Sequence, residues 1–152
     1  MLDKVINDKD FAHLMQKNMQ EIIIHFFEKE QNFGILCKIE DISFNPELPK
    51  DINAEFRPFT LFFLAGYTFE TARIEEDILV FEAGFGSDNF GSVVTVPLLS
   101  IMQVIIDETP VFINLANSEV KPQAKKEEDL GGVENSMASF LNNPENSKFL
   151  KK

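Results

Sequence analysis

The sequence predicts an α+β fold, with an N-terminal amphipathic helix followed by antiparallel strands around a central apolar helix. Apolar residues recur at helical spacing between Asp10 and Glu30. A second segment, residues 58–74, is apolar on nearly every side when it is read as a helix. The segments after it alternate apolar and other residues and are separated by turn signals, which is typical of antiparallel strands.

The N-terminal helix is the clearest element. Either Asp8 or Asp10 can cap its start, and Gly34 can follow its end. Its apolar stripe consists of Phe11, Leu14, Met15, Met19, Ile22, Ile23, Phe26 and Phe27. This stripe predicts a helix that packs on its own domain, and the alternative is a helix that also reaches a partner subunit.

An extended segment follows from Gly34 to Phe44, in which the apolar parity shifts near Asp41 and predicts a bulge. A loop with two prolines then spans residues 45–55. Residues 58–74 decide the fold class. As a strand this segment would carry Ala65 and Gly66 in its middle, where they have little packing value. We therefore predict a buried helix over Phe59–Ile74.

The rest of the domain reads as strands. Residues 79–85 alternate, the turn Gly86–Ser92 joins them to residues 93–96, and residues 111–115 form a last strand. The pattern of residues 97–106 fits a strand and a helix equally well. The glycine-rich turn resembles a phosphate-binding loop, but it joins two strands and precedes no helix, so we interpret it as a hairpin.

Charge and composition limit the function. The chain has 152 residues, with 25 acidic and 14 basic side chains. Residues 1–120 contain 20 acidic and 8 basic residues, so this domain lacks the basic face that nucleic acids and anionic membranes require. No apolar run is long enough to span a membrane, and no leader-like segment opens the chain. A cytoplasmic protein is expected.

The predicted organisation has three parts. Residues 1–33 form the helix that packs on the domain, residues 34–116 form the domain, and residues 117–152 form a polar linker and a mobile tail. The tail has two short apolar patches, residues 137–141 and 149–150, and is either frayed or a docking peptide for a protein partner.

Catalytic motifs are absent, and no cofactor is expected. The single Cys37 lies between apolar neighbours and predicts a buried, inert thiol. Two histidines do not suffice for a histidine-based metal centre. Glu70, near the end of the apolar helix, is the one candidate general base if it is desolvated. The alternative for Glu70 is an exposed ion pair with Arg73.

The order of these elements, with the pattern LFFLAGYTFETARI, resembles the hot-dog fold of acyl-CoA thioesterases and related dehydratases. The resemblance extends to virulence-associated hot-dog proteins that are co-regulated with flagella. It implies a homodimer with two central helices back to back and an acyl ligand, such as an acyl-CoA, at the interface. The His-Gly-Gly turn of such families is replaced by Phe56-Arg57-Pro58, which implies weak or no thioesterase activity. The ligand-binding residues that the resemblance implies are Asn53, Phe56, Arg57, Phe59, Phe63, Gly66 and Tyr67.

A second resemblance competes with the first. The segments ILVFEAGFGS and VVTVPLLSIMQVI look like the stringent starvation protein B family, which are peptide-delivery adaptors of the ClpXP protease. That family has an N-terminal helix, a β-sandwich and a tail that ends in a short apolar-basic motif, similar in character to KFLKK here. It implies a strand over Leu61–Phe69 and a peptide groove lined by Ala83, Gly84 and Phe85.

Overall fold

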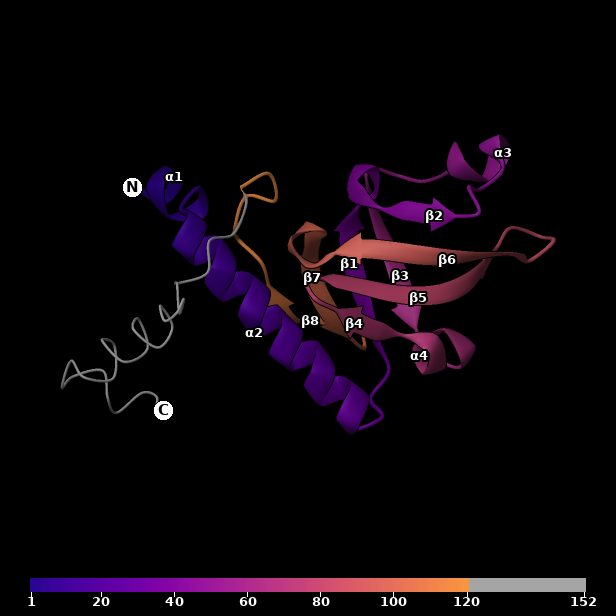
Figure 1. The fold of residues 1–152 in the computed structure, drawn as a ribbon, viewed down its shortest axis with the longest axis horizontal. Helices are drawn as coiled ribbons and strands as arrows, with labels where there is room; N and C mark the ends of the chain where they lie inside the picture. The colour runs from indigo at the N-terminus through magenta and orange to yellow at the C-terminus, as the bar shows by residue number, and fades with distance from the viewer. Residues whose placement is uncertain (121–152) are drawn as a thin grey trace.

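Two four-stranded antiparallel sheets and a long N-terminal helix make up the protein in a computed structural model, which describes residues 1–120 (Figure 1). The first sheet has the order β3-β1-β7-β8 and the second has the order β2-β6-β5-β4. The strands of the first sheet are β1 (Phe33–Lys38), β3 (Phe59–Leu64), β7 (Ile101–Ile106) and β8 (Thr109–Ile113). The strands of the second sheet are β2 (Ser43–Asn45), β4 (Arg73–Glu75), β5 (Ile78–Phe85) and β6 (Phe90–Pro97). The α+β class with antiparallel sheets and an N-terminal helix is confirmed.

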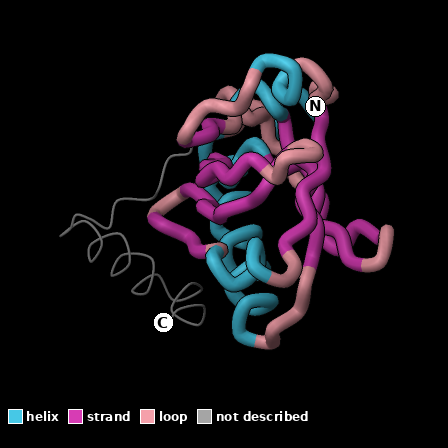
Figure 2. The backbone as a smooth tube through the Cα atoms, turned by 90° about the vertical axis from the view of Figure 1, so that its right-hand side faces the viewer, coloured by secondary structure: helices cyan, strands magenta, loops and turns pink. Residues whose placement is uncertain are grey.

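The N-terminal helix α2 (Lys9–Glu28) forms as the periodicity predicted. The Asp8 side chain caps it by accepting a hydrogen bond from the backbone N–H of Phe11, at 3.0 Å. Met19 and Ile23 are fully buried and join the main core, so the helix packs on its own domain. A short helix α1 (Leu2–Ile6) precedes it, and Figure 2 shows the helical layer beside the strands.

The predicted central helix over Phe59–Ile74 is wrong. Residues 59–64 form the edge strand β3, which pairs with β1 over its whole length, and only Tyr67–Thr71 form a short helix, α4. Burial along β3 alternates: Phe62 and Leu64 are buried, whereas the odd-numbered residues are exposed. Gly66, with φ of 60°, turns the chain between strand and helix, in the left-handed region that glycine adopts easily.

Strand pairing determines the conformation of several shorter segments. The irregularity near Asp41 is a single 3₁₀ turn (Ile39–Asp41), after which β2 joins the second sheet. The ambiguous residues 97–106 become a 3₁₀ turn (Leu98–Ser100) and strand β7. The glycine-rich segment is the turn of the β5–β6 hairpin, as predicted. A last helix, α3 (Lys50–Asn53), lies in the proline-containing loop.

The core lies between the two sheets and is closed on one side by α2. Leu64 and Val104 of the first sheet and Phe81 and Val94 of the second are fully buried in one cluster. This apolar contact between inner faces is what defines a β-sandwich. Within residues 1–120, no helix combines the length and the apolar character needed to cross a membrane.

Candidate functional site

A cleft opens beside the β5–β6 hairpin, bordered by α4 and by the loop after β2. We call it the hairpin cleft, and its volume is about 390 Å³. That volume falls within the usual range for ligand sites, about 300–1,000 Å³. The residues that line it are Asn45, Pro46, Tyr67, Glu82, Ala83, Gly84, Asn89, Gly91, Ser92 and Val93. In Figure 1 the hairpin extends past the rest of the sandwich, between β2 and α4.

The turn of the hairpin shapes one end of the cleft. Asn89 has φ of 52°, a conformation that asparagine tolerates better than most residues. Its side chain folds over Gly84, where a Cβ atom would lie 1.8 Å from Asn89 Oδ1. Glycine at position 84 is therefore needed to let the amide of Asn89 lie along the cleft.

Hydrogen bonds fix the two walls. On one side, the Tyr67 hydroxyl donates to Glu82 Oε1 at 2.5 Å, and the backbone N–H of Glu82 donates to Thr71 Oγ1 at 2.9 Å, which ties α4 to β5. On the other side, the buried Ser92 hydroxyl donates to the Pro46 carbonyl at 2.9 Å. These bonds join segments that are distant in sequence, so the cleft is a preformed feature of the fold.

The polar groups of the cleft are amides, hydroxyls and one carboxylate. Among residues 1–120, no lysine or arginine lines it. Donation to Glu82 raises the pKa of Tyr67 above its ordinary value, and the negative charge of the same carboxylate adds to the rise. Within the described residues, the charged group at the cleft is thus the carboxylate of Glu82.

We expect Glu82→Gln to lower the pKa of Tyr67 toward its ordinary value, because the charge that disfavours the phenolate is removed. Ultraviolet absorbance during a pH titration measures this pKa directly, since Tyr67 is the one tyrosine of the chain and tryptophan is absent. The matched control is Asp88→Asn in the hairpin turn, which should leave the titration unchanged. An unchanged titration of Glu82→Gln would contradict the contact between Tyr67 and Glu82.

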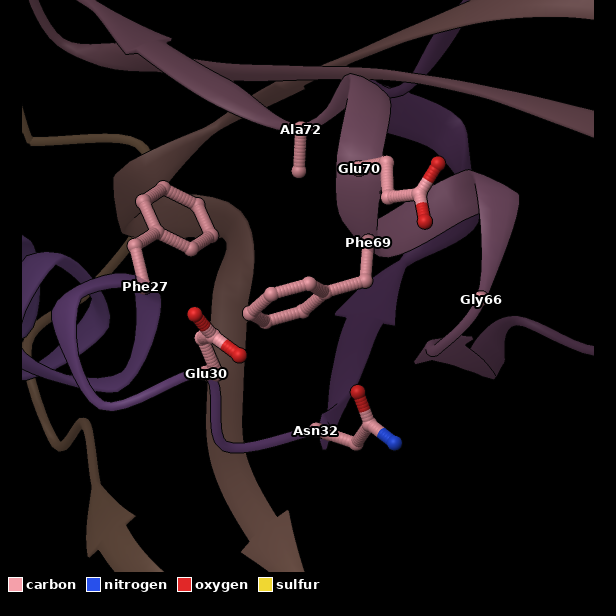
Figure 3. Close-up of a pocket in the computed structure, with 7 residues that line it drawn as sticks. All are labelled: Phe27, Glu30, Asn32, Gly66, Phe69, Glu70 and Ala72. Carbon is pink, nitrogen blue, oxygen red and sulfur yellow. The ribbon is translucent and has the colours of Figure 1, made fainter.

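The residues that the hot-dog resemblance implied do not converge on one site. Tyr67 lines the hairpin cleft, whereas Gly66 and Glu70 line a second cleft of about 600 Å³ with Phe27 and Phe69 (Figure 3). Asn53 and Phe56 line a third cleft, of about 700 Å³, between β2 and α3. The resemblance implied an acyl ligand between the central helices of two copies, and residues 59–74 form no such long helix.

The remaining implied residues lie on the surface. Phe59 and Phe63 are 51% and 68% exposed on β3, and Arg57 is exposed just before that strand. Glu70 is exposed as well, so the desolvation that would make it a general base is missing. Its alternative role also fails, because Arg73 forms an ion pair with Glu75 and not with Glu70.

Two of the three groove residues that the second resemblance implied lie at the hairpin cleft. Ala83 and Gly84 line it, but Phe85 packs edge-to-face against Phe44 and Phe56 instead. Glu82, Asn89 and the loop residues Asn45 and Pro46 were missed. Alternation along β5 places Glu82 and Gly84 on the same face and was the available signal.

Cys37 is fully buried as predicted, and burial raises the pKa of its thiol, which keeps it protonated and unreactive. Among the described residues, no group of three or more potential ligands could hold a metal ion.

Comparison with known proteins adds no assignment: no protein-family model, no curated protein sequence and no solved structure matches this chain.

Proposed function

We propose that this chain is a peptide-binding adaptor that resembles the stringent starvation protein B family and holds an extended peptide in the hairpin cleft. The observation that carries the proposal is the β-sandwich with its N-terminal helix. Residues 59–64 form strand β3, whereas the hot-dog resemblance requires a helix there. The proposal is also supported by Ala83 and Gly84, two of the three groove residues that this resemblance implies, because both line the hairpin cleft.

The edge of β6 supports an extended peptide as the ligand. Strand β2 pairs with β6 only over Val93–Thr95, so residues 90–92 have β5 on one side and no strand on the other within the described chain. Unpaired backbone groups at a sheet edge can bond the main chain of an extended peptide. Gly91 and Ser92 of this segment also line the cleft.

The acyl-ligand hypothesis is less well supported. A CoA moiety carries phosphates, and the cleft offers them no cation. The domain as a whole carries 20 acidic residues against 8 basic ones over residues 1–120. Acyl-CoA binding with weak or absent hydrolysis stays a prediction, which native mass spectrometry with a panel of acyl-CoAs checks.

A random peptide library displayed on phage provides the test of the adaptor proposal, because the natural peptide is unidentified. We expect the folded protein to enrich a common motif. We also expect Gly91→Trp to weaken the best peptide at least tenfold in fluorescence anisotropy, because a Cβ atom at this position meets no other heavy atom within 4 Å and the indole can occupy the cleft. The matched control is Leu14→Trp, at an exposed position on α2, which should bind like the unmodified chain. Circular dichroism establishes that both variants fold.

Two results would count against the proposal: enrichment of no motif, or equal binding by Gly91→Trp. A docking role of the tail, which is the alternative to a frayed end, concerns residues outside the described part of the chain and is tested separately. Deleting residues 137–152 should leave peptide binding intact and abolish delivery to a partner protein. Loss of peptide binding in that deletion would contradict this division of roles.

A further inference from the structure

The outer face of the first sheet is apolar and open at β3. Phe59, Leu61 and Phe63 are 51%, 40% and 68% exposed and share this face with Leu36 of β1. Gly34 lies beneath two of them: a Cβ atom there would be 3.3 Å from atoms of Leu61 and Phe63. We call Phe59, Leu61 and Phe63 the β3 ridge. These three large apolar side chains are therefore exposed to solvent on the outer face of the sheet.

Strand β3 is also an unprotected edge. It pairs with β1 on one side, and no other strand of the described chain pairs with it on the other. Proteins commonly guard such edges with charged residues, proline or bulges. None of these interrupts Phe59–Leu64, whose sequence is Phe-Thr-Leu-Phe-Phe-Leu. An edge of this composition, left bare, would be an aggregation site, so it points to a partner.

The backbone groups at this edge belong to the ridge residues. The N–H of Ile39 donates to the Pro58 carbonyl at 2.9 Å, so the backbone of residue 58 faces β1. Hydrogen bonding alternates along an antiparallel strand. The backbones of Thr60, Phe62 and Leu64 therefore also face β1, and Phe59, Leu61 and Phe63 present their N–H and C=O groups to the open edge.

Charge identifies the partner that fits. Residues 1–120 carry 20 acidic side chains, so two copies of the domain repel each other over most of their surface. The four strands of the first sheet contain no acidic residue, and their one charged residue is Lys38. This sheet is therefore the surface on which a second copy can approach without juxtaposed carboxylates.

A two-fold interface requires reciprocal contacts, and antiparallel pairing about Leu61 meets this condition while it places a phenylalanine opposite a phenylalanine on each side of the centre. We propose that β3 pairs antiparallel with β3 of a second copy, with Leu61 opposite Leu61 and Phe59 opposite Phe63, so that the first sheet continues across the dimer. In this register Arg57 lies opposite Ala65 of the second copy, close to the short helix that carries Glu70. Aromatic cross-strand pairs and an opposite-charge contact would then stabilise both ends of the junction.

This interface differs from the back-to-back helices that the hot-dog resemblance implied, and it is independent of the hairpin cleft. Cysteine cross-linking tests its register. Directly opposed residues have Cα atoms about 5.5 Å apart in a hydrogen-bonded pair, within the range of about 4.4–6.8 Å that a disulfide bridges. Under mild oxidation, Leu61→Cys should form a covalent dimer. The unmodified chain should not, since Cys37 is buried.

Phe63→Cys provides the control for register. Two copies of residue 63 would lie four residues apart along the strand, about 14 Å, so Phe63→Cys alone should not cross-link. Mixed with Phe59→Cys, it should. A monomer at all accessible concentrations in sedimentation equilibrium would overturn the proposal. Efficient linking of Phe63→Cys alone, without linking of Leu61→Cys, would overturn it as well.

Disruption gives a second readout that does not depend on cysteines. Leu61→Lys should raise the dimer dissociation constant at least 100-fold, whereas Leu14→Lys, on the exposed face of α2, should leave it unchanged. Dissociation by Leu14→Lys alone would overturn the proposal in favour of a helix-mediated dimer.

If the tail instead covers the ridge, removal of residues 121–152 would convert a monomer to a dimer, which would also overturn the proposal. Phage-selected peptides should still bind Leu61→Lys, so failure of this proposal and of the peptide-binding proposal are distinguishable.

Discussion

Replacing Leu64 by alanine should lower the free energy of unfolding by about 3–5 kcal/mol. Leu64 is the last residue of β3, and its side chain is fully buried in the core between the two sheets. The change removes apolar contacts and leaves a cavity that a packed sandwich fills only partly. Urea denaturation, followed by circular dichroism, measures the loss.

The matched control is Leu14→Ala, which removes the same atoms from a side chain that is 52% exposed on α2. It should cost less than about 1 kcal/mol, because much of the leucine surface is already in water. Equal losses for the two variants would mean that Leu64 is not buried. The inward register of β3, and with it the outward register of the β3 ridge, would then be wrong.

Asn114→Ala should destabilise the domain by about 2–4 kcal/mol through hydrogen bonds that nothing replaces. The amide of Asn114 is 1% exposed. Its Nδ2 donates to the carbonyls of Leu99 and Ile101, at 3.2 and 3.1 Å, and its Oδ1 accepts from the N–H of Ala116 at 2.9 Å. Without this side chain, three buried backbone groups at the start of β7 and the end of β8 lose their partner.

Asn117→Ala tests whether the large effect expected for Asn114→Ala comes from the burial of its hydrogen bonds. Asn117 makes similar bonds, with Asn7 and with the N–H of Glu119, but these are exposed, so water replaces them at little cost. Its loss should stay below about 1 kcal/mol. A larger loss of stability for Asn117→Ala than for Asn114→Ala would contradict this explanation. It would show that the hydrogen bond between Asn117 and Asn7 holds the N-terminal segment more firmly than its exposure indicates.

Local sequence signals were sufficient for the N-terminal helix and the hairpin. The helix has a 20-residue amphipathic pattern and a capping aspartate, both of which act within the segment itself. The β5–β6 hairpin combines alternation with a turn whose residues 86–89 are glycine, serine, aspartate and asparagine. In both elements, the residues that stabilise the conformation lie within the segment or next to it in sequence.

The candidate site was only partly accessible to such reasoning. Ala83 and Gly84 were named only through the second resemblance, and Tyr67 was named through the first, for a different ligand. The contact between Tyr67 and Glu82 joins α4 to β5, and the bond between Ser92 and Pro46 joins β6 to a loop 46 residues earlier. No periodicity within either segment indicates that these residues meet.

Signals within the sequence were enough to predict the N-terminal helix, the hairpin, the buried thiol of Cys37 and the net acidic charge of residues 1–120. That residues 59–64 form a strand depends on pairing with a segment that is distant in sequence. The run Phe-Thr-Leu-Phe-Phe-Leu is apolar at almost every position, so its pattern fits the periodicity of a helix and that of a strand equally well. Pairing with β1 selects the extended form, because it satisfies the backbone of both strands and buries Phe62 and Leu64 while leaving Phe59, Leu61 and Phe63 outside.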